Sequence, residues 1–305
     1  MPLSKPLGKS KSHRLNTRSL AAFKRMEILA HSVVEGFLTG LHKSPFKGFA
    51  IEFEEHRHYV RGDDLKHLDW KLLGKVDRYY IKQYEEDTSL RAFMILDSSG
   101  SMSYSSNELT KLEYGRYIAG VMTYILMQQQ DSVGLVTCDT DIQRYLPPRA
   151  TRPHFKRIMD TLDALEPQNE TQLSEVLHKM AQRIKRRALI IIISDLFDDP
   201  DKLSLALSHF AHKKHEVIVF RTLDRREVDF DFNHPTRFED LETDGFQQID
   251  PIQLRKEYKR VFDEHRNKIK KTCFERRIDF QEIFTDEPFE RRIAQYLMER
   301  LRRTK

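Results

Sequence analysis

A carboxylate and two hydroxyls at alternate positions follow a short apolar run near residue 95. The run extends from Phe93 to Leu96, and the polar side chains after it are those of Asp97, Ser99 and Ser101. Four consecutive apolar residues predict a short buried strand. Ligands collect where the parallel strands of a doubly wound sheet end. Oxygen atoms at such a place suit a hard divalent cation such as Mg²⁺, so the spacing predicts a cation-binding loop.

Two later segments end in oxygen-bearing side chains of the same kind. Thr171 begins a predicted helix after the polar stretch 168–170, and Asp195 follows the aliphatic run 189–194. Together with the first loop they predict one oxygen cage, made by Asp97, Ser99, Ser101, Thr171 and Asp195. Other interpretations stay open: Thr171 and Asp195 could each be a simple helix N-cap, and a polar strand-to-helix loop is common by chance.

Apolar runs and helical periodicity alternate along the chain after residue 90. An unbroken aliphatic strand such as 189–194 is typical of a strand covered on both faces. Alternation of strands and helices predicts a doubly wound, mostly parallel α/β sheet flanked by helices. The predicted strands are 91–97, 132–138, 142–146, 188–194, 216–220 and 278–284, and the predicted helices are 111–130, 154–165, 172–185, 201–211, 251–271 and 288–303.

The composition divides the chain into three parts. Residues 1–15 are predicted to be a disordered basic tail, since Met1 to Met26 hold seven Lys or Arg and no acid. Residues 16–88 are predicted to form a helix at 19–38 and a small β-rich subdomain. Residues 89–305 are predicted to form the main α/β domain, with an insertion at about 222–272.

No segment of the sequence predicts export or membrane insertion. The longest aliphatic run, Ala188 to Ile193, is far shorter than the roughly 20 residues of a membrane helix. The first 26 residues contain no apolar core of a signal peptide. The two cysteines, Cys138 and Cys273, are too few for a disulfide framework. We therefore expect a cytoplasmic protein without a transmembrane segment.

The residues also carry a resemblance to known families. The run Asp97-x-Ser99-x-Ser101, then Thr171 and then Asp195, resembles the three-part metal motif of von Willebrand factor A domains. Upstream, a second set resembles the signature of the bacterial domain-of-unknown-function 58 family, which couples this segment to an A-type domain. That set is Glu52-Phe53, Arg57-x-Tyr59, Arg61-Gly62-Asp63-Asp64 and Leu68-Asp69-Trp70.

The resemblance implies roles for the five site residues. Ser99, Ser101 and Thr171 would bind the metal directly, while Asp97 and Asp195 would act largely through waters. It also implies a bacterial cytoplasmic protein, often encoded beside an AAA+ ATPase of the MoxR type, that acts in the assembly or maturation of other proteins. Neutral hydroxyl ligands leave much of the ion's charge unquenched. A protein partner that offers an Asp or Glu could then complete the coordination.

Two details of this expectation stay open. The Asp195-Leu196 pair replaces the Asp-Gly common in A domains, which is expected to alter the shape of the loop rather than its ligation. The residues also do not discriminate among Mg²⁺, Mn²⁺ and Ca²⁺.

Enzymatic functions fit the sequence less well than a binding role. An aspartyl-nucleophile phosphatase needs an acid two residues after Asp97, where Ser99 stands instead. Gly-x-Ser-x-Gly and the Gly-x-x-x-x-Gly-Lys phosphate loop are both missing from the sequence. A metal-dependent hydrolase stays an alternative, as does nucleic-acid binding through the basic termini, although the sequence contains no named nucleic-acid motif. The prediction is a protein-interaction module that is not an enzyme.

Overall fold

The computed structural model describes the main domain almost completely and the preceding part only in short pieces. The described residues are 50–58, 72, 74, 79–88, 90–168, 170–232, 236–239, 246–249 and 251–303. The predicted tail and the helix at 19–38 lie outside them, as does most of the upstream family signature.

Six strands form the central sheet in the order β10-β7-β6-β3-β4-β5. All neighbouring pairs are parallel except β4 with β5. The chain passes from β3 to β4 and β5 on one side, and then returns to β6 on the other. The border of β3 and β6 is therefore a topological switch point, where ligands bind in open α/β sheets. The strands are β3 (Arg91–Asp97), β4 (Ser132–Cys138), β5 (Ile142–Arg149), β6 (Leu189–Ser194), β7 (Glu216–Leu223) and β10 (Asp279–Phe284).

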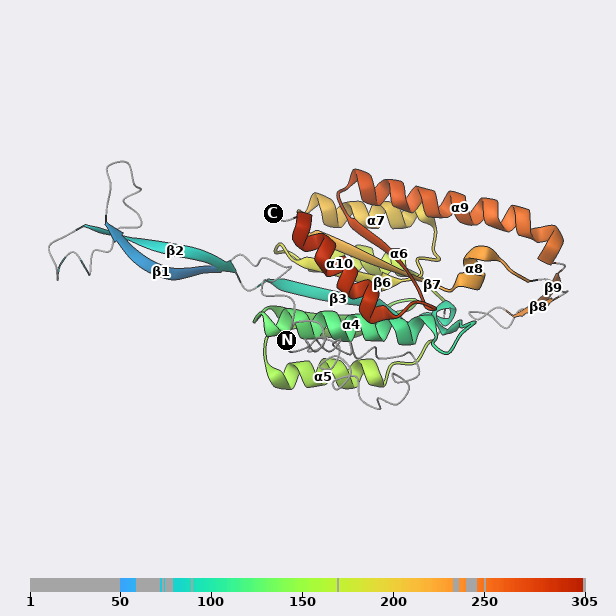
Figure 1. The fold of residues 1–305 in the computed structure, drawn as a ribbon, viewed down its shortest axis with the longest axis horizontal. Helices are drawn as coiled ribbons and strands as arrows, with labels where there is room; N and C mark the ends of the chain where they lie inside the picture. The colour runs from blue at the N-terminus through green and yellow to red at the C-terminus, as the bar shows by residue number, and fades with distance from the viewer. Residues whose placement is uncertain are drawn as a thin grey trace, which may run out of the picture.

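Helices cover both faces of this sheet, as Figure 1 shows. Side chains of alternate strand residues enter two separate cores: Leu96 and Ile193 face one, and Ile95 and Ile192 face the other. The predicted fold class, a doubly wound, mostly parallel α/β sheet flanked by helices, is confirmed. One face carries α4 (Lys111–Gln128), α5 (Arg152–Asp163) and α10 (Phe289–Arg303), and the other α6 (Leu173–Arg183), α7 (Pro200–His212) and α9 (Pro251–Glu275).

Smaller elements lie around the main sheet. Two antiparallel pairs of strands are separate from it, one in the predicted β-rich segment and one in the predicted insertion at about 222–272. The short helix α8 was not predicted from the sequence. In chain order these elements are β1 (Ala50–His58), β2 (Tyr80–Thr88), the 3₁₀ turn η2 (Gly100–Ser103), α8 (Arg225–Asp229), β8 (Thr236–Glu239) and β9 (Phe246–Ile249). In the described part of the chain, no helix combines the length and apolarity that crossing a bilayer requires.

Gly134, in β4, lies directly against the backbone of β5. A Cβ atom at Gly134 would lie 2.7 Å from the carbonyl oxygen of Leu146 and 3.0 Å from the nitrogen of Pro148. Backbone atoms cannot move away as a side chain can, so we expect Gly134→Ala to lower the free energy of unfolding by about 2–3 kcal/mol. Urea denaturation monitored by circular dichroism measures this loss.

Gly115 on α4 offers the matched control. Its Cβ would meet only side-chain methyl groups, of Leu96 at 3.0 Å and Ile193 at 3.2 Å, and alanine also favours the helix. Gly115→Ala should therefore cost clearly less than Gly134→Ala, and a larger loss at Gly115 would contradict this account of the β4–β5 contact.

Candidate functional site

Asp97 is fixed at the border between β3 and β6. It is the last residue of β3 and is 1% exposed. One carboxylate oxygen, Oδ2, accepts a hydrogen bond from the Ser194 hydroxyl at 2.6 Å, and Oδ1 accepts one from the backbone N–H of Ser99 at 2.9 Å. Ser194 is the last residue of β6, so the sheet itself sets the position of this carboxylate.

The two predicted serines converge just beyond Asp97. The Oγ atoms of Ser99 and Ser101 lie 3.1 Å apart. Ser99 is fully buried, whereas Ser101, in η2, is partly exposed. The hydroxyl pair therefore leads from the buried carboxylate to the protein surface.

Asp195 lies beside the same loop, immediately after β6. Its side chain is fully buried; Oδ2 accepts a hydrogen bond from Lys111 Nζ at 2.7 Å, and Oδ1 accepts one from the backbone N–H of Phe197 at 3.2 Å. The negative charge of Asp195 is near enough to act on Asp97. The alternative that Asp195 caps a helix is wrong, because α7 is capped by Asp199, which accepts hydrogen bonds from the N–H groups of Asp201 and Lys202.

Thr171 belongs to a loop that crosses the same edge of the sheet. The backbone N–H of Gln168 donates to the carbonyl of Ser98 at 2.9 Å, and that of Gln172 donates to the carbonyl of Asp139 at 3.1 Å. Ser98 follows β3 and Asp139 follows β4, so both ends of the loop are held at the carboxyl ends of these strands. Thr171 lies between these anchors and is partly exposed. It is not the N-cap of α6, a position that Gln172 occupies.

Burial and repulsion act together on the Asp97 carboxyl. Desolvation is the larger effect and the negative charge of Asp195 the next, and they raise its pKa to about 7 although hydrogen bonds from Ser194 and Ser99 favour the ionised form. A divalent cation near these two carboxylates would relieve both costs. In the ranges that the structure describes, no three His, Cys, Asp or Glu side chains group as a metal site. A cation here would therefore depend on the hydroxyls as well as on the two carboxylates, a donor set that fits Mg²⁺.

Lys111 is a member of this site that sequence reasoning missed. It is the first residue of α4 and is fully buried. Its Nζ atom donates to Asp195 Oδ2 and to Glu227 Oε1, each at 2.7 Å, and lies 4.9 Å from the centre of the Phe197 ring. Burial opposes the charged form, but the two carboxylates outweigh it and raise the pKa of Lys111. A lysine in the first turn of a helix normally points into solvent, so nothing in the sequence marked it.

A second buried cation approaches Asp195 from β7. Arg221 is 0% exposed, and its Nε donates to the backbone carbonyl of Asp195 at 2.9 Å. Its Nη1 lies 3.8 Å from Glu282 Oε1, and neither Nη atom has a hydrogen-bond partner among the described residues. Burial lowers the pKa of this guanidinium. Lys111 and Arg221 thus bring two positive charges to Asp195 from distant parts of the chain.

The Asp195-Leu196 pair adopts a backbone conformation usual for glycine. Leu196 has a φ of 59°, in the left-handed region that costs an ordinary residue roughly 1–2 kcal/mol. Its side chain is fully buried in the core beneath α6 and α7, which offsets that cost. Its backbone N–H donates to the Ser194 hydroxyl at 2.8 Å. Leucine therefore does not prevent the turn that presents Asp195 and Ser194.

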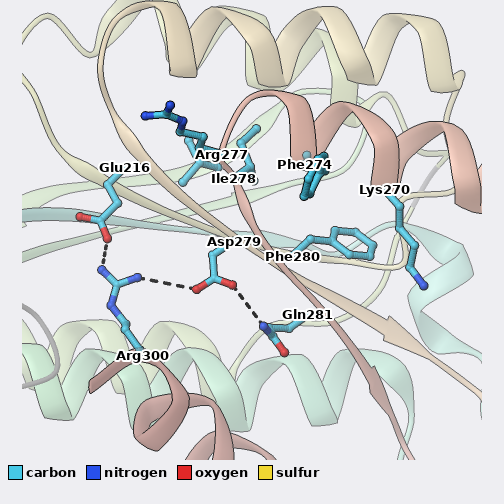
Figure 2. Close-up of a pocket in the computed structure, with 11 residues that line it drawn as sticks. Glu216, Lys270, Phe274, Arg277, Ile278, Asp279, Phe280, Gln281 and Arg300 are labelled. Carbon is cyan, nitrogen blue, oxygen red and sulfur yellow. Dashed lines mark hydrogen bonds and ion pairs between the residues drawn. The ribbon is translucent and has the colours of Figure 1, made fainter. Parts of the chain in front are cut away.

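A separate hollow of about 580 Å³ lies at the opposite end of the sheet, where β7 and β10 begin (Figure 2). Arg300 pairs there with Glu216 and lies 3.8 Å from Asp279, as the dashed lines in Figure 2 show. Burial raises the pKa of Cys273 to about 12, so this thiol stays protonated. Cys273 is therefore not an activated nucleophile in this hollow.

The raised pKa of Asp97 predicts how the stability of the metal-free protein depends on pH. The carboxyl keeps its proton up to about pH 7 in the folded chain, whereas its ordinary pKa is 3.8. Between these values the folded state binds more protons than the unfolded state, so stability should fall as pH rises and level off above about pH 7. Urea denaturation in the presence of a chelator at pH 5, 6, 7 and 8 measures this change. Asp97→Asn should flatten it, and an unchanged slope in that variant would refute the assignment to Asp97.

Comparison with known proteins gives a family match and several likenesses. The model of the family "Protein of unknown function DUF58" matches residues 55–268. The uncharacterized protein Rv1480 of Mycobacterium tuberculosis is 25% identical over 258 residues, which are 83% of this chain and 80% of that protein; Mb1516 of Mycobacterium bovis gives the same values.

Two solved structures are similar at low sequence identity. The conserved hypothetical protein BatB from Bacteroides thetaiotaomicron has 14% identity and a TM-score of 0.45, over 70% of this chain and 99% of that chain. The SpRpn10 VWA domain has 13% identity and a TM-score of 0.39, over 68% of this chain and 95% of that one.

Proposed function

We propose a function on one premise: this chain belongs to the family "Protein of unknown function DUF58". In this proposal, the chain is a protein-interaction module whose site holds a divalent cation and recognises an acidic side chain. The observation that carries the proposal is the paired hydroxyls of Ser99 and Ser101, 3.1 Å apart beside two buried carboxylates. The carboxylates of Asp97 and Asp195 already accept hydrogen bonds from the protein at all four oxygens. The hydroxyls are therefore the groups best placed to touch a cation.

In this proposal each residue has a distinct part. Ser99, Ser101 and Thr171 would hold Mg²⁺ through hydroxyl oxygens, and Mn²⁺ and Ca²⁺ are the alternatives. Asp97 and Asp195 would balance its charge without being displaced from their hydrogen bonds. The bound cation would supply a Lewis-acidic position open to an outside ligand. Ser101 and Thr171, the partly exposed members of the set, define where an Asp or Glu of the partner would enter.

The partner that we propose is an AAA+ ATPase of the MoxR type, with this chain as its adaptor in the assembly of other proteins. The support is the resemblance of the upstream motifs and the lack of a phosphate loop in this sequence, which means that ATP hydrolysis would come from the partner. The proposal assigns the protein a binding role without catalysis and places it in the cytoplasm.

Binding to a purified MoxR-type ATPase from the same organism tests the proposal. Biolayer interferometry should detect binding in Mg²⁺ that is lost in a chelator and lost on Ser99→Ala or Ser101→Ala. Ser103→Ala is the matched control, because the Ser103 hydroxyl donates to the carbonyl of Gly100 at 2.6 Å within the same turn and is not part of the proposed site. Binding that is equal in Mg²⁺ and in chelator would refute the role of the cation.

A further inference from the structure

A ring of buried charge surrounds Asp195, and its balance bears on what the site can bind. Three carboxylates and two cations take part. Lys111 contacts two of the carboxylates and Arg221 contacts the backbone of Asp195. When all five are ionised, they carry one net negative charge. The members of the ring are Asp97, Asp195, Glu227, Lys111 and Arg221, and each side chain is buried except that of Glu227, which is 14% exposed. Glu282, 3.8 Å from Arg221, is not counted with them because it is paired with Arg266 at 2.6 Å and Lys270 at 2.7 Å.

The net charge of the ring determines whether a bound divalent cation is fully neutralised. A divalent cation entering the ring would convert a net charge of −1 into +1, and an interior of low dielectric constant disfavours such an excess strongly. One further anion would neutralise it. Without the ammonium of Lys111 the ring would carry −2, and the cation alone would neutralise it.

The Lys111 charge is held in place by its surroundings. The ammonium is fixed by two hydrogen bonds of 2.7 Å and by the Phe197 ring. Lys111 is also the first residue of α4, whose first turn is stabilised by the capping box of Thr110 and Glu113. Lys111 therefore cannot turn into solvent to make room for a cation without breaking both ion pairs.

We propose that Lys111 is the residue that makes cation binding and carboxylate binding depend on each other. Its fixed positive charge weakens the hold of the ring on a divalent cation, and it leaves the cation-loaded site short of one negative charge that an acidic partner supplies. Because binding free energies are reciprocal, the carboxylate then tightens the cation by the same factor as the cation tightens the carboxylate. This inference rests on the proposed function and adds to it the device that couples the two ligands.

Titration of the full chain with Mn²⁺, with free Mn²⁺ measured by electron paramagnetic resonance, tests the inference. Titrations are run in sodium acetate, as the carboxylate probe, and in sodium chloride of equal ionic strength. The unaltered chain should bind Mn²⁺ about ten-fold more tightly in acetate than in chloride. Lys111→Met should bind about ten-fold more tightly than the unaltered chain in chloride and should lose the acetate effect.

Glu227 provides the charge-matched variants. Glu227→Gln should weaken Mn²⁺ binding, since the ring is then neutral before the cation arrives. The double variant Lys111→Met with Glu227→Gln restores the net charge of −1, so its affinity should return to within about three-fold of the original. A merely structural role of Lys111 would not restore the affinity in this way. If Lys111→Met folds poorly because it leaves two carboxylates unpaired, the double variant still tests the inference, since it leaves only Asp195 unpaired.

The outcomes separate the two proposals. If the unaltered chain binds Mn²⁺ and the Lys111 variant binds it with the same affinity, or keeps the same acetate effect, the inference is overturned and the proposed function stands. If neither the unaltered chain nor any variant binds Mn²⁺, the proposed function fails. Tighter binding by Lys111→Met, loss of its acetate effect and restoration in the double variant together support the inference.

Discussion

Mg²⁺ or Mn²⁺ is expected to raise the melting temperature of the protein by about 5–10 °C at a hundred-fold excess over the dissociation constant. The expected gain follows from mass action, because the loops that carry the oxygen ligands meet only in the folded state. Asp97→Ala should abolish the rise, since it removes the buried carboxylate on which the Ser99 loop is built. Differential scanning fluorimetry with and without a chelator measures the shift.

Asp139 provides the matched control for this experiment. It is a buried carboxylate in the residue after β4, next to the site in space but outside the predicted ligand set. Its Oδ1 accepts hydrogen bonds from the Asp141 N–H and from the Gln143 amide within its own turn. Asp139→Ala should lower the melting temperature and keep the metal-dependent rise. Loss of the rise in both variants would mean that the Asp97 result reflects damage to the fold rather than loss of the site.

Lys111→Met is expected to lower the free energy of unfolding by about 3–5 kcal/mol in the absence of a divalent cation. The change removes the partner of two carboxylates, Asp195 with no exposure and Glu227 with little. Methionine fills the space of the lysine stem but cannot donate to either. Burial already raises the pKa of Glu227 even with the lysine present, so the unpaired state is costly. Chemical denaturation in a chelator measures the loss.

Lys179→Met provides the same substitution in an exposed ion pair. Lys179 Nζ lies 2.9 Å from Asp141 Oδ1, and the two side chains are 50% and 60% exposed. Water screens such a pair, so we expect a much smaller loss than that of Lys111→Met. Equal losses at Lys179 and Lys111 would contradict a special role for the buried pair.

The sequence by itself determined the elements that make up the sheet. Aliphatic runs and helical periodicity placed the strands β3, β4 and β6 and the helices between them, because burial on both faces of a parallel sheet requires continuous apolar residues. The end of β5 was missed by three residues: the predicted strand ends at Leu146, whereas β5 continues through Pro147 and Pro148 to Arg149. β5 is an edge strand, where a proline need not donate to a neighbour.

A short sequence motif could also have predicted the helix α8 but was not used. Asp224 and Glu227 form a capping box at the start of α8, and Asp-x-x-Glu is a readable helix-start signal. The five-residue helix lies in the polar first part of the predicted insertion at about 222–272. Recognition of this motif would have placed Glu227 on a helix, although not beside Lys111.

Only the tertiary structure decided which charged groups surround the site. Asp97, Ser99 and Ser101 are close in sequence, so their spacing alone predicted a cation-binding loop. Lys111, Glu227 and Arg221 come from three separate elements, and each alone resembles an ordinary surface residue. They meet Asp195 because the strand order places β3, β6 and β7 side by side, with α4 and α8 following their carboxyl ends. Charge in a low-dielectric interior acts through distance in space, which the order of residues along a chain does not contain.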